Sequence, residues 1–360
     1  MKIKDLCSYA PKSRIKAREA ADNAKYLFFT SSADENKRYT DFQFNKEAII
    51  MGTGGNATLH YYNGKFSVST DCLVLLPNSK IKCKYLYYFF KSHMSVLEAG
   101  FKGAGLKHTN KKYIEEINIS EVPDLTTQEK IISHLDTISD NIEKINRELE
   151  LFDSLIKARF VEMFGDYLKD DRRPLSEVAK ITGGLTKNSN RNTFETKMPY
   201  LRVANVFYNM LDLREILEIG VKEEEIEKTL LQAGDLLFVE GNGSIEQIGR
   251  VAIWDGSIDP ILHQNHLIKA RFNNEIIAPE YALFYFMLQD GRQQIISKSV
   301  STSGLNTLSV NKVSSLLLPI PPIALQKQFS VFVKLVDKSK LAVQQSLEKT
   351  QQLFDSLMQE

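Results

Sequence analysis

Leu-Phe-Asp-Ser-Leu stands at Leu151–Leu155 and again at Leu353–Leu357, a shift of 353 − 151 = 202 residues. Each copy lies near the end of a stretch with a helical pattern. A proline followed a few residues later by a glutamine precedes each stretch, in VPDLTTQEKI (Val122–Ile131) and in PPIALQKQF (Pro321–Phe329). A 360-residue chain that repeats one unit at about half its length is a tandem duplication, and such a unit is far longer than a solenoid repeat. Two copies of one unit predict one task carried out twice.

The first helical stretch carries an apolar seam whose spacings alternate between four and three residues. A period of 3.5 residues is typical of a coiled coil and requires a partner helix. An ordinary core helix is the alternative interpretation of such a stripe. The seam consists of Ile131, Leu135, Ile138, Ile142, Ile145, Leu149, Phe152 and Ile156.

The second helical stretch repeats this seam, and two polar residues interrupt it. The seam positions are Val336, Lys340, Val343, Leu347, Thr350, Phe354 and Leu357. Polar residues in a seam tend to fix register and partner choice. The simplest solution packs the two helices against each other. Because a globular unit precedes each helix, we expect an antiparallel pair.

The globular halves also match in the order of their features. Each has an apolar run that leads into a glycine-rich turn, at Gly52–Asn56 and at Glu240–Ser244. An aromatic helix and then a polar loop follow in both halves. Short β-rich runs with one or two helices predict an α+β fold. We therefore expect two pseudo-repeated globular domains, joined by two long helices that form an antiparallel coiled coil. The expected segments are 1–125, 126–166, 167–322 and 323–360.

Composition is that of an ordinary globular protein, with 43% hydrophobic and 25% charged residues. The cysteines are three in number and scattered, so they predict neither a disulfide framework nor a metal site. The sequence lacks an export signal and a run long enough to span a bilayer, so we expect a cytoplasmic protein without membrane contact. Residues 1–125 hold 19 basic and 13 acidic side chains. That excess suits a polyanion, and equally a solvated surface.

Catalytic signatures are missing from the sequence. We find no P-loop and no Asn- or Asp-Pro-Pro-aromatic motif of adenine methyltransferases. The glycine turns do not open a GxGxxG motif, so they are better interpreted as strand-to-loop turns than as phosphate cradles. His263-Gln264-Asn265-His266 has two histidines three residues apart, but further ligands do not cluster nearby, so we expect no metal site.

The chain resembles the specificity subunits of type I restriction–modification enzymes over essentially all of its 360 residues. The resemblance rests on the two-fold repeat, the double proline before Gln326, the two LFDSL endings and the GLNTLS loop at Gly304–Ser309. The first copy departs from it with Val122-Pro123 in place of the double proline. The first globular half is also the shorter one.

The resemblance implies a function and a set of partners. Each globular domain would be a target recognition domain that reads one half of a split sequence in double-stranded DNA. The helices would set the spacer between the half-sites and dock two modification (methyltransferase) subunits, which restriction subunits would join. S-adenosylmethionine, ATP and Mg would belong to those partners, so this chain would be no enzyme and would hold no cofactor.

The predicted DNA contacts lie in polar loops, where glycine allows close approach of the backbone. Lysine and arginine would mostly hold phosphates, whereas asparagine and glutamine would read bases. Taken one at a time, each of these residues is also compatible with plain solvated surface. The candidates are Lys12, Arg14, Lys16, Arg18, Lys102, Lys107, His108, Asn110, Lys111, Lys112, Lys187, Asn188, Asn190, Arg191, Asn242, Gln264, Asn265, Ser303, Asn306 and Thr307.

Two other function classes stay open at this point. A self-contained restriction enzyme would need catalytic motifs that the sequence lacks. A coiled-coil adaptor that binds only protein would not need the basic first half or the polar glycine loops.

Overall fold

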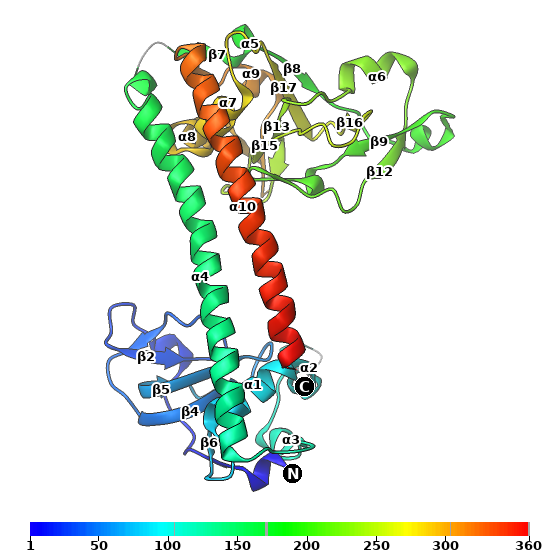
Figure 1. The fold of residues 1–360 in the computed structure, drawn as a ribbon. Helices are drawn as coiled ribbons and strands as arrows, with labels where there is room; N and C mark the ends of the chain where they lie inside the picture. Colours follow the sequence, from blue (N-terminus) through cyan, green and yellow to red (C-terminus); the bar gives the residue numbers. More distant parts are fainter. Residues whose placement is uncertain (104, 170–171, 303, 359–360) are drawn as a thin grey trace. The chain divides into compact units, whose positions relative to one another are not determined.

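The computed structural model describes residues 1–103, 105–169, 172–302 and 304–358. The chain divides into two compact units. Unit 1 comprises Met1–Arg147 and Gln344–Glu360, and unit 2 comprises Glu148–Val343. Two long helices, α4 (Leu125–Phe164) and α10 (Ile323–Leu357), each contribute one part to unit 1 and another to unit 2 (Figure 1). The prediction of two long helices is therefore confirmed.

Unit 1 is built on one sheet with the strand order β1-β6-β4-β5-β2-β3. Neighbouring strands are antiparallel except β2 and β5, which are parallel. The strands are β1 (Cys7–Tyr9), β2 (Tyr26–Phe29), β3 (Arg38–Tyr39), β4 (Phe44–Gly52), β5 (Leu59–Val68) and β6 (Cys72–Pro77). The shorter helices are α1 (Cys83–Ser92), α2 (Met94–Ala99) and α3 (Lys111–Glu115).

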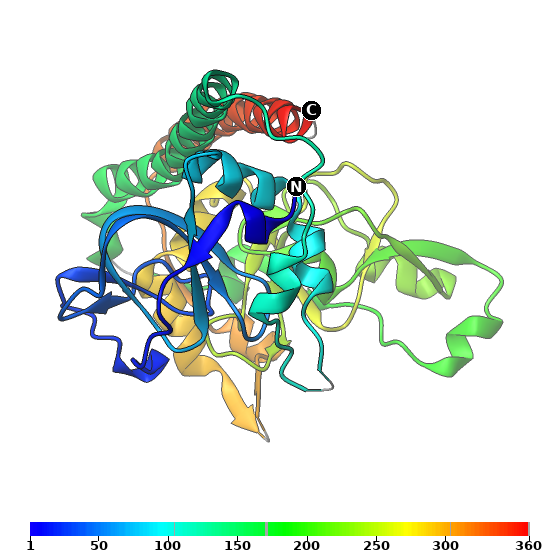
Figure 2. The same cartoon turned by 90° about the horizontal axis from the view of Figure 1, so that it is seen from below.

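The central strand of this sheet, β4, is buried on both faces. Ile49 and Met51 join the core that α1 covers, whereas Ala48 and Ile50 join a second cluster on the opposite face. This alternation follows from the two-residue period of a strand. At the chain start, the backbone N–H of Ile3 donates to a carbonyl oxygen at residue 117, so segments far apart in sequence lie side by side (Figure 2).

Unit 2 holds a smaller sheet of the same kind and several short sheets around it. Its strands are β7 (Arg172–Pro174), β8 (Ala179–Gly183), β9 (Lys197–Leu201), β10 (Val206–Phe207), β11 (Met210–Leu211), β12 (Leu217–Gly220), β13 (Leu236–Val239), β14 (Gly241–Asn242), β15 (Val251–Ile253), β16 (Leu262–His263), β17 (Leu267–Phe272), β18 (Val300–Thr302), β19 (Leu305–Thr307) and β20 (Leu317–Pro319). Its shorter helices are α5 (Leu175–Val178), α6 (Glu223–Thr229), α7 (Pro279–Met287), α8 (Gln289–Lys298) and α9 (Val310–Ser314).

The two units share a sheet topology, which supports the duplication. Unit 1 contains the order β1-β6-β4-β5, and unit 2 contains β8-β17-β13-β15. All of these neighbours are antiparallel, and the strands come in the same chain order in both units. Two helices, a loop, a short helix and a long helix then follow in each. The α+β class and the pseudo-repeat are thus confirmed.

The long helices run in opposite directions within each unit. In unit 1, Phe354 near the end of α10 clusters with Leu135 near the start of α4. In unit 2, Phe329 near the start of α10 lies with its ring centroid 5.4 Å from that of Phe160 near the end of α4. The antiparallel arrangement predicted from the seams therefore holds in both units.

The seam positions are the less exposed positions of the two helices. Leu135, Ile156, Val336 and Phe354 are buried, with exposed fractions of 2–7%. The remaining seam residues are half-buried, namely Ile131, Ile138, Ile142, Ile145, Leu149, Phe152, Lys340, Val343, Leu347, Thr350 and Leu357. Lys340 is held in the seam of unit 2 by Asp153, with 2.6 Å between Nζ and Oδ1.

A fully buried glutamine anchors each long helix. In unit 1 the side-chain oxygen of Gln128 accepts from the backbone N–H of Lys82, the N-cap of α1, at 2.7 Å. In unit 2 Gln326 does the same for Ala278, the N-cap of α7, at 2.9 Å. Each amide nitrogen also donates to the carbonyl of the proline five residues earlier. The proline–glutamine spacing noted in the sequence is thus a docking device between the long helix and the aromatic helix.

Candidate nucleic-acid interface

In unit 1, the glycine turn after β4 pairs with the loop that precedes α3. His108 forms isolated bridges with Gly54 and with Lys102. The backbone N–H of Thr109 donates to the carbonyl of Thr53 at 3.0 Å. Two loops whose paired residues Gly54 and His108 are 108 − 54 = 54 residues apart in sequence are therefore joined by backbone hydrogen bonds into one surface.

Unit 2 repeats this pairing. β14, which belongs to the glycine turn after β13, pairs with β19 in the loop that precedes α9, and Asn242 lies opposite Asn306. The backbone N–H of Leu308 donates to the carbonyl of Glu240 at 2.7 Å. Both units thus present a glycine turn and a polar loop side by side, on the same scaffold.

The basic candidates of unit 1 are exposed and two groups of them meet. Lys12, Asn110 and Lys111 line one cavity of about 460 Å³, together with Tyr9 and Thr53. The Nζ of Lys111 lies 4.4 Å from the centre of the Tyr9 ring. The exposed candidates are Lys12, Arg14, Lys16, Arg18, Lys102, Lys107, His108, Asn110, Lys111 and Lys112.

In unit 2, the polar candidates form two neighbouring groups. Lys187 and Asn188 are exposed and line a cavity of about 260 Å³. Asn190 is exposed in the same segment. The half-buried pair Gln264 and Asn265 is joined to this segment because the backbone N–H of Asn265 donates to the residue 185 carbonyl at 2.9 Å. Asn242 and Thr307 are half-buried in the β14–β19 pair.

Arg191 has a structural position instead of an exposed one. It is 7% exposed, and its guanidinium donates to both carboxylate oxygens of Glu225 at 2.9 and 3.0 Å. The same side chain donates to the carbonyls of Thr186 and Gly220. Its donors are therefore occupied within the unit, and we remove Arg191 from the predicted DNA contacts.

Two asparagines form side-chain hydrogen bonds within their own unit. The side-chain oxygen of Asn110 accepts from the Tyr113 backbone N–H at 3.0 Å, which caps the start of α3. Asn306 is 8% exposed and its amide donates toward the carbonyls of Asn242 and Gly243. An asparagine immediately before a helical run is the usual capping signal, which could have identified Asn110 from the sequence. Ser303 lies outside the described residues.

The two histidines of the His263–His266 segment have different surroundings. His263 is fully buried and its Nδ1–H donates to the Thr229 carbonyl at 2.8 Å. Burial lowers the pKa of His263 to about 4. His266 is exposed and its Nδ1 lies 2.7 Å from a carboxylate oxygen of Glu240. Across the part of the chain that the structure describes, no group of three or more histidine, cysteine or acidic side chains is placed to hold a metal.

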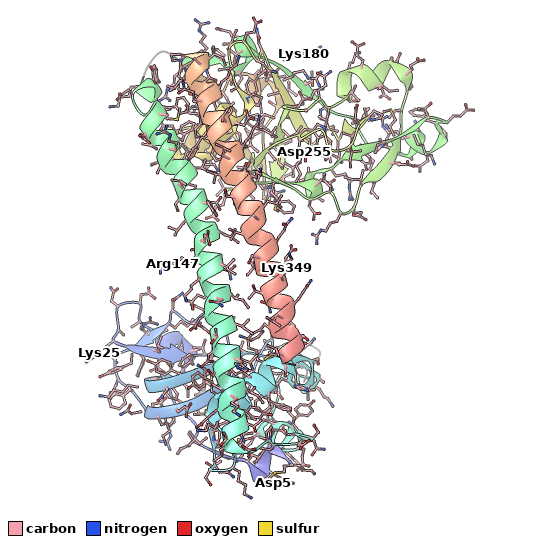
Figure 3. All side chains as sticks on the ribbon, viewed as in Figure 1. Asp5, Lys25, Arg147, Lys180, Asp255 and Lys349 are labelled. Carbon is pink, nitrogen blue, oxygen red and sulfur yellow. The ribbon has the colours of Figure 1, made fainter. Side chains whose placement is uncertain are left out.

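Some exposed cations escaped the sequence interpretation. Lys197, at the start of β9, lines the same cavity as Lys187, although ten residues separate the two in sequence. Lys25 in unit 1 and Lys180 on β8 in unit 2, both labelled in Figure 3, are also exposed. No local motif marks these lysines, since their surroundings depend on strand pairing.

Among the described residues, no helix is both long enough and apolar enough to cross a membrane.

Known proteins resemble this chain over most of its length. It is 24% identical over 309 residues to the EcoKI specificity subunit of the type I restriction enzyme of Escherichia coli K12, which covers 78% of this chain and 65% of that relative. It is 22% identical over 312 residues to the MjaVIII specificity subunit of Methanocaldococcus jannaschii, covering 81% of this chain and 72% of that one. The match thus spans slightly less than two thirds of the EcoKI subunit.

Solved structures show the same fold. The type I restriction–modification S subunit from M. genitalium superposes with a TM-score of 0.63 at 17% identity, covering 99% of this chain and 94% of that one. A chain from a study of complex assembly in a type I system gives 0.56 at 13% identity, covering 100% and 96%. The model of the type I restriction modification DNA specificity domain matches residues 1–151 and 171–352. The chain therefore belongs to the family of type I restriction modification DNA specificity domains, as a specificity subunit.

Proposed function

We propose that this chain is the non-catalytic part of a type I restriction–modification complex and that each unit reads one half of a bipartite DNA target. The proposal rests on a surface that both units build in the same way. In both units a glycine turn is paired with a polar loop on the same strand order, but the side chains that the loops present differ. One scaffold with two different polar surfaces suits the reading of two different half-sites.

The chemistry of the two surfaces suits DNA in different ways. Unit 1 presents mainly exposed lysines, which contact phosphates and set the register of a protein on DNA. Unit 2 presents Gln264 and Asn265, whose amides can bond the adenine edge in the major groove. We infer that unit 2 draws more of its sequence reading from amides than unit 1 does.

The test is a domain exchange. Residues 1–125 are replaced by the matching segment of a related subunit, the protein is combined with its methyltransferase, and methylated sites are mapped by sequencing. One half-site should change and the other should stay. A change in both half-sites would contradict separate reading by the two units.

A second test addresses the phosphate contacts. Replacing Lys107 and Lys112 by glutamine should weaken binding to all sequences alike and reduce the salt slope by about 1 per lost contact. Lys25→Gln is a control with an exposed lysine outside the paired loops. A changed base preference at an unchanged slope would assign these lysines to base reading.

We also propose that the helices dock the modification subunits and set the spacer. Support comes from apolar side chains that lie off the seam in unit 2. Leu151 and Leu155 on α4 are 60% and 48% exposed, and Val331 and Leu335 on α10 are 60% and 63% exposed. Each pair is four residues apart, so its members share one helix face. Exposed apolar stripes of this kind mark protein–protein contacts.

Charged substitutions test the docking proposal. Leu151→Asp with Leu335→Asp should abolish co-purification with the modification subunit while the melting temperature stays within a few degrees. Leu106→Asp is the control, because Leu106 is 68% exposed in a loop of unit 1. Unchanged co-purification would move the docking surface elsewhere. It stays a prediction that restriction subunits, S-adenosylmethionine, ATP and Mg belong to the assembled complex. A cytoplasmic location also stays a prediction.

The spacer is tested by lengthening both helices. Four residues inserted after Ile145 and four after Val343 add about 6 Å of helix at 1.5 Å per residue. DNA advances about 3.4 Å per base pair, so the spacer should grow by one or two base pairs while both half-sites keep their sequence. An unchanged spacer with full methylation would exclude the helices as the ruler.

A further inference from the structure

The loop before the short helix α3 in unit 1 corresponds residue by residue to the loop before α9 in unit 2. Both helices have five residues, and the side chain of the residue before each helix, Asn110 or Ser309, caps its start. The pairing with the glycine turn also has the same register. His108 pairs with the turn of unit 1 two residues before its cap, and Thr307 pairs with the turn of unit 2 two residues before its own.

The two loops have kept a leucine while the residues around it changed. Residues 105–123 and 304–322 are related by a constant shift of 304 − 105 = 199 residues and differ at most positions. The four residues after the leucine are Lys-His-Thr-Asn in one loop and Asn-Thr-Leu-Ser in the other, so none of them is shared. The identical pairs are Gly105 and Gly304, Leu106 and Leu305, and Pro123 and Pro322.

The kept leucine is exposed in both units. Leu106 is 68% exposed and Leu305 is 47% exposed, whereas the core positions Ile114 and Val313 of the same stretch are buried and differ in identity. A Cβ added to the glycine before either leucine would meet no atom of the described residues within 4 Å. An exposed side chain that stays the same while its neighbours diverge indicates a contact outside the chain.

Both leucines lie near the turn of a two-stranded hairpin. In unit 2, β18 and β19 are antiparallel, and Leu305 is the first residue of β19. In unit 1, the backbone groups of Lys102 and His108 bond each other at 2.9 and 3.0 Å, so Leu106 lies in the loop that they close. The major groove of B-DNA admits a two-stranded β-ribbon, and the apolar group that its base edges present is the C5-methyl of thymine.

We propose that Leu106 and Leu305 each contact the C5-methyl group of a thymine, one in each half of the DNA target. The proposal rests on the proposed reading of DNA and adds a residue that selects one base in each half-site. Polar neighbours that differ between the loops suit different half-sites. An identical apolar side chain suits a base feature that both half-sites share, and its contact needs no hydrogen bond.

The probe is duplex DNA in which deoxyuridine replaces one thymine at a time. Uracil pairs with adenine as thymine does and lacks only the methyl group. The half-sites are first mapped by sequencing the methylated sites. The complex of the chain with its methyltransferase is then titrated with fluorescein-labelled duplexes. In each half-site, one uracil substitution should weaken binding about fourfold, the change that burial of one methyl group corresponds to.

Variants of the two leucines test the assignment. In Leu106→Ala, the effect of uracil should vanish in the half-site that residues 1–125 read and persist in the other, and Leu305→Ala should show the reverse. Methionine at either position keeps an apolar contact of similar size and should keep most of the effect. Leu317→Ala is the matched control, because Leu317 is 38% exposed on β20, outside the hairpin. All of these variants should still co-purify with the modification subunit, since none changes α4 or α10.

The outcomes separate this contact from DNA reading as such. An effect of uracil that is as large in Leu106→Ala and Leu305→Ala as in the unchanged chain would overturn the proposal and leave DNA reading intact. So would a rise in the fluorescence of 2-aminopurine beside the thymine that the alanine variants abolish, because the leucines would then unstack bases. Without any sequence-specific binding by the unchanged complex, the proposed function itself would fall, and this proposal with it.

Discussion

The two units use the same positions with opposite charges. In unit 1, Lys84 on the aromatic helix α1 pairs with Asp136 on the long helix α4, with 2.7 Å between nitrogen and oxygen. In unit 2, Glu280 on α7 pairs with Lys334 on α10 at 3.2 Å. Counted from the N-cap and from the buried glutamine, Lys84 matches Glu280 and Asp136 matches Lys334. After duplication the contact was kept and its polarity was reversed.

The buried glutamines did not diverge in this way. Both are fully buried, and both bond an N-cap and a proline carbonyl. Few other side chains can replace a buried amide, because the replacement would leave a hydrogen-bond donor or acceptor unpaired in the interior, which is costly. A surface ion pair contributes little, and its partners can be exchanged together. Burial therefore separates the contacts that stay fixed from those that vary.

The largest expected effect comes from removing a glutamine anchor. Gln326→Leu leaves the Ala278 N–H and two carbonyls without a partner and should lower the free energy of unfolding of unit 2 by about 5 kcal/mol. Trp254 is the single tryptophan and is buried in unit 2, so its fluorescence follows this unit. Urea unfolding with this signal measures the change.

Gln128→Leu is the matching variant in unit 1, followed by hydrogen exchange of α1. Gln351→Leu is the control, because the Gln351 side chain is exposed on α10 and donates to the exposed Asp355 of the same helix. If Gln326→Leu has the same free energy of unfolding as the Gln351→Leu control, the interpretation of Gln326 as an anchor of α10 is wrong.

The second effect concerns Arg191. Arg191→Met removes the donor of the half-buried Glu225 carboxylate and of the Thr186 and Gly220 carbonyls, so it should destabilise unit 2 by about 4 kcal/mol. The measurement is again Trp254 fluorescence in urea. Arg214→Met is the control and should leave the urea midpoint unchanged, since Arg214 is 90% exposed in its pair with Asp212. Normal stability with lost DNA binding would restore Arg191 to the DNA contacts.

Arg191 also illustrates how far sequence alone can predict this molecule. The repeat, the long helices and their direction follow from periodicity and order, which are local properties of the chain. The arginine lies in a polar segment that looks like a DNA-contact loop, but its partner Glu225 is 34 residues away. Sequence patterns do not reveal such a pairing. The sequence predicts the loops at His108 and Asn306 individually, and only strand pairing brings each of them to its glycine turn.

The third effect appears only in acid and only in unit 2. Burial, and secondarily the charge of Lys269, lower the pKa of His263 to about 4 from an unfolded value of 6.5. As the pH falls, His263 therefore binds a proton in the unfolded chain before it does so in the folded chain. The contribution of His263 to stability is full above about pH 6.5 and is lost as the pH falls toward 4, by up to about 3 kcal/mol.

Urea unfolding of unit 2 between pH 7.5 and 4.5 tests this. The slope against pH should become shallower in His263→Leu after correction for its lower stability at pH 7.5. His266→Gln should keep the slope, because His266 is more than half exposed. A slope that survives in His263→Leu would assign the acid sensitivity to other groups.

The smallest expected effect tests the reversed ion pairs directly. Asp136→Lys places two cations together and removes the acceptor of the Tyr88 hydroxyl, so unit 1 should lose about 1 kcal/mol. Adding Lys84→Glu recreates the polarity of unit 2 and should recover the Coulombic part, about 0.5 kcal/mol, while the tyrosine stays unpaired. A double-mutant cycle isolates this coupling from the single changes. The mirror cycle at Glu280 and Lys334 should give a smaller value, because Lys334 is 71% exposed and solvent screens its charge. A coupling energy of zero in both cycles would mean that the reversal is neutral drift at the surface and that these ion pairs add nothing to the packing of each long helix on its aromatic helix.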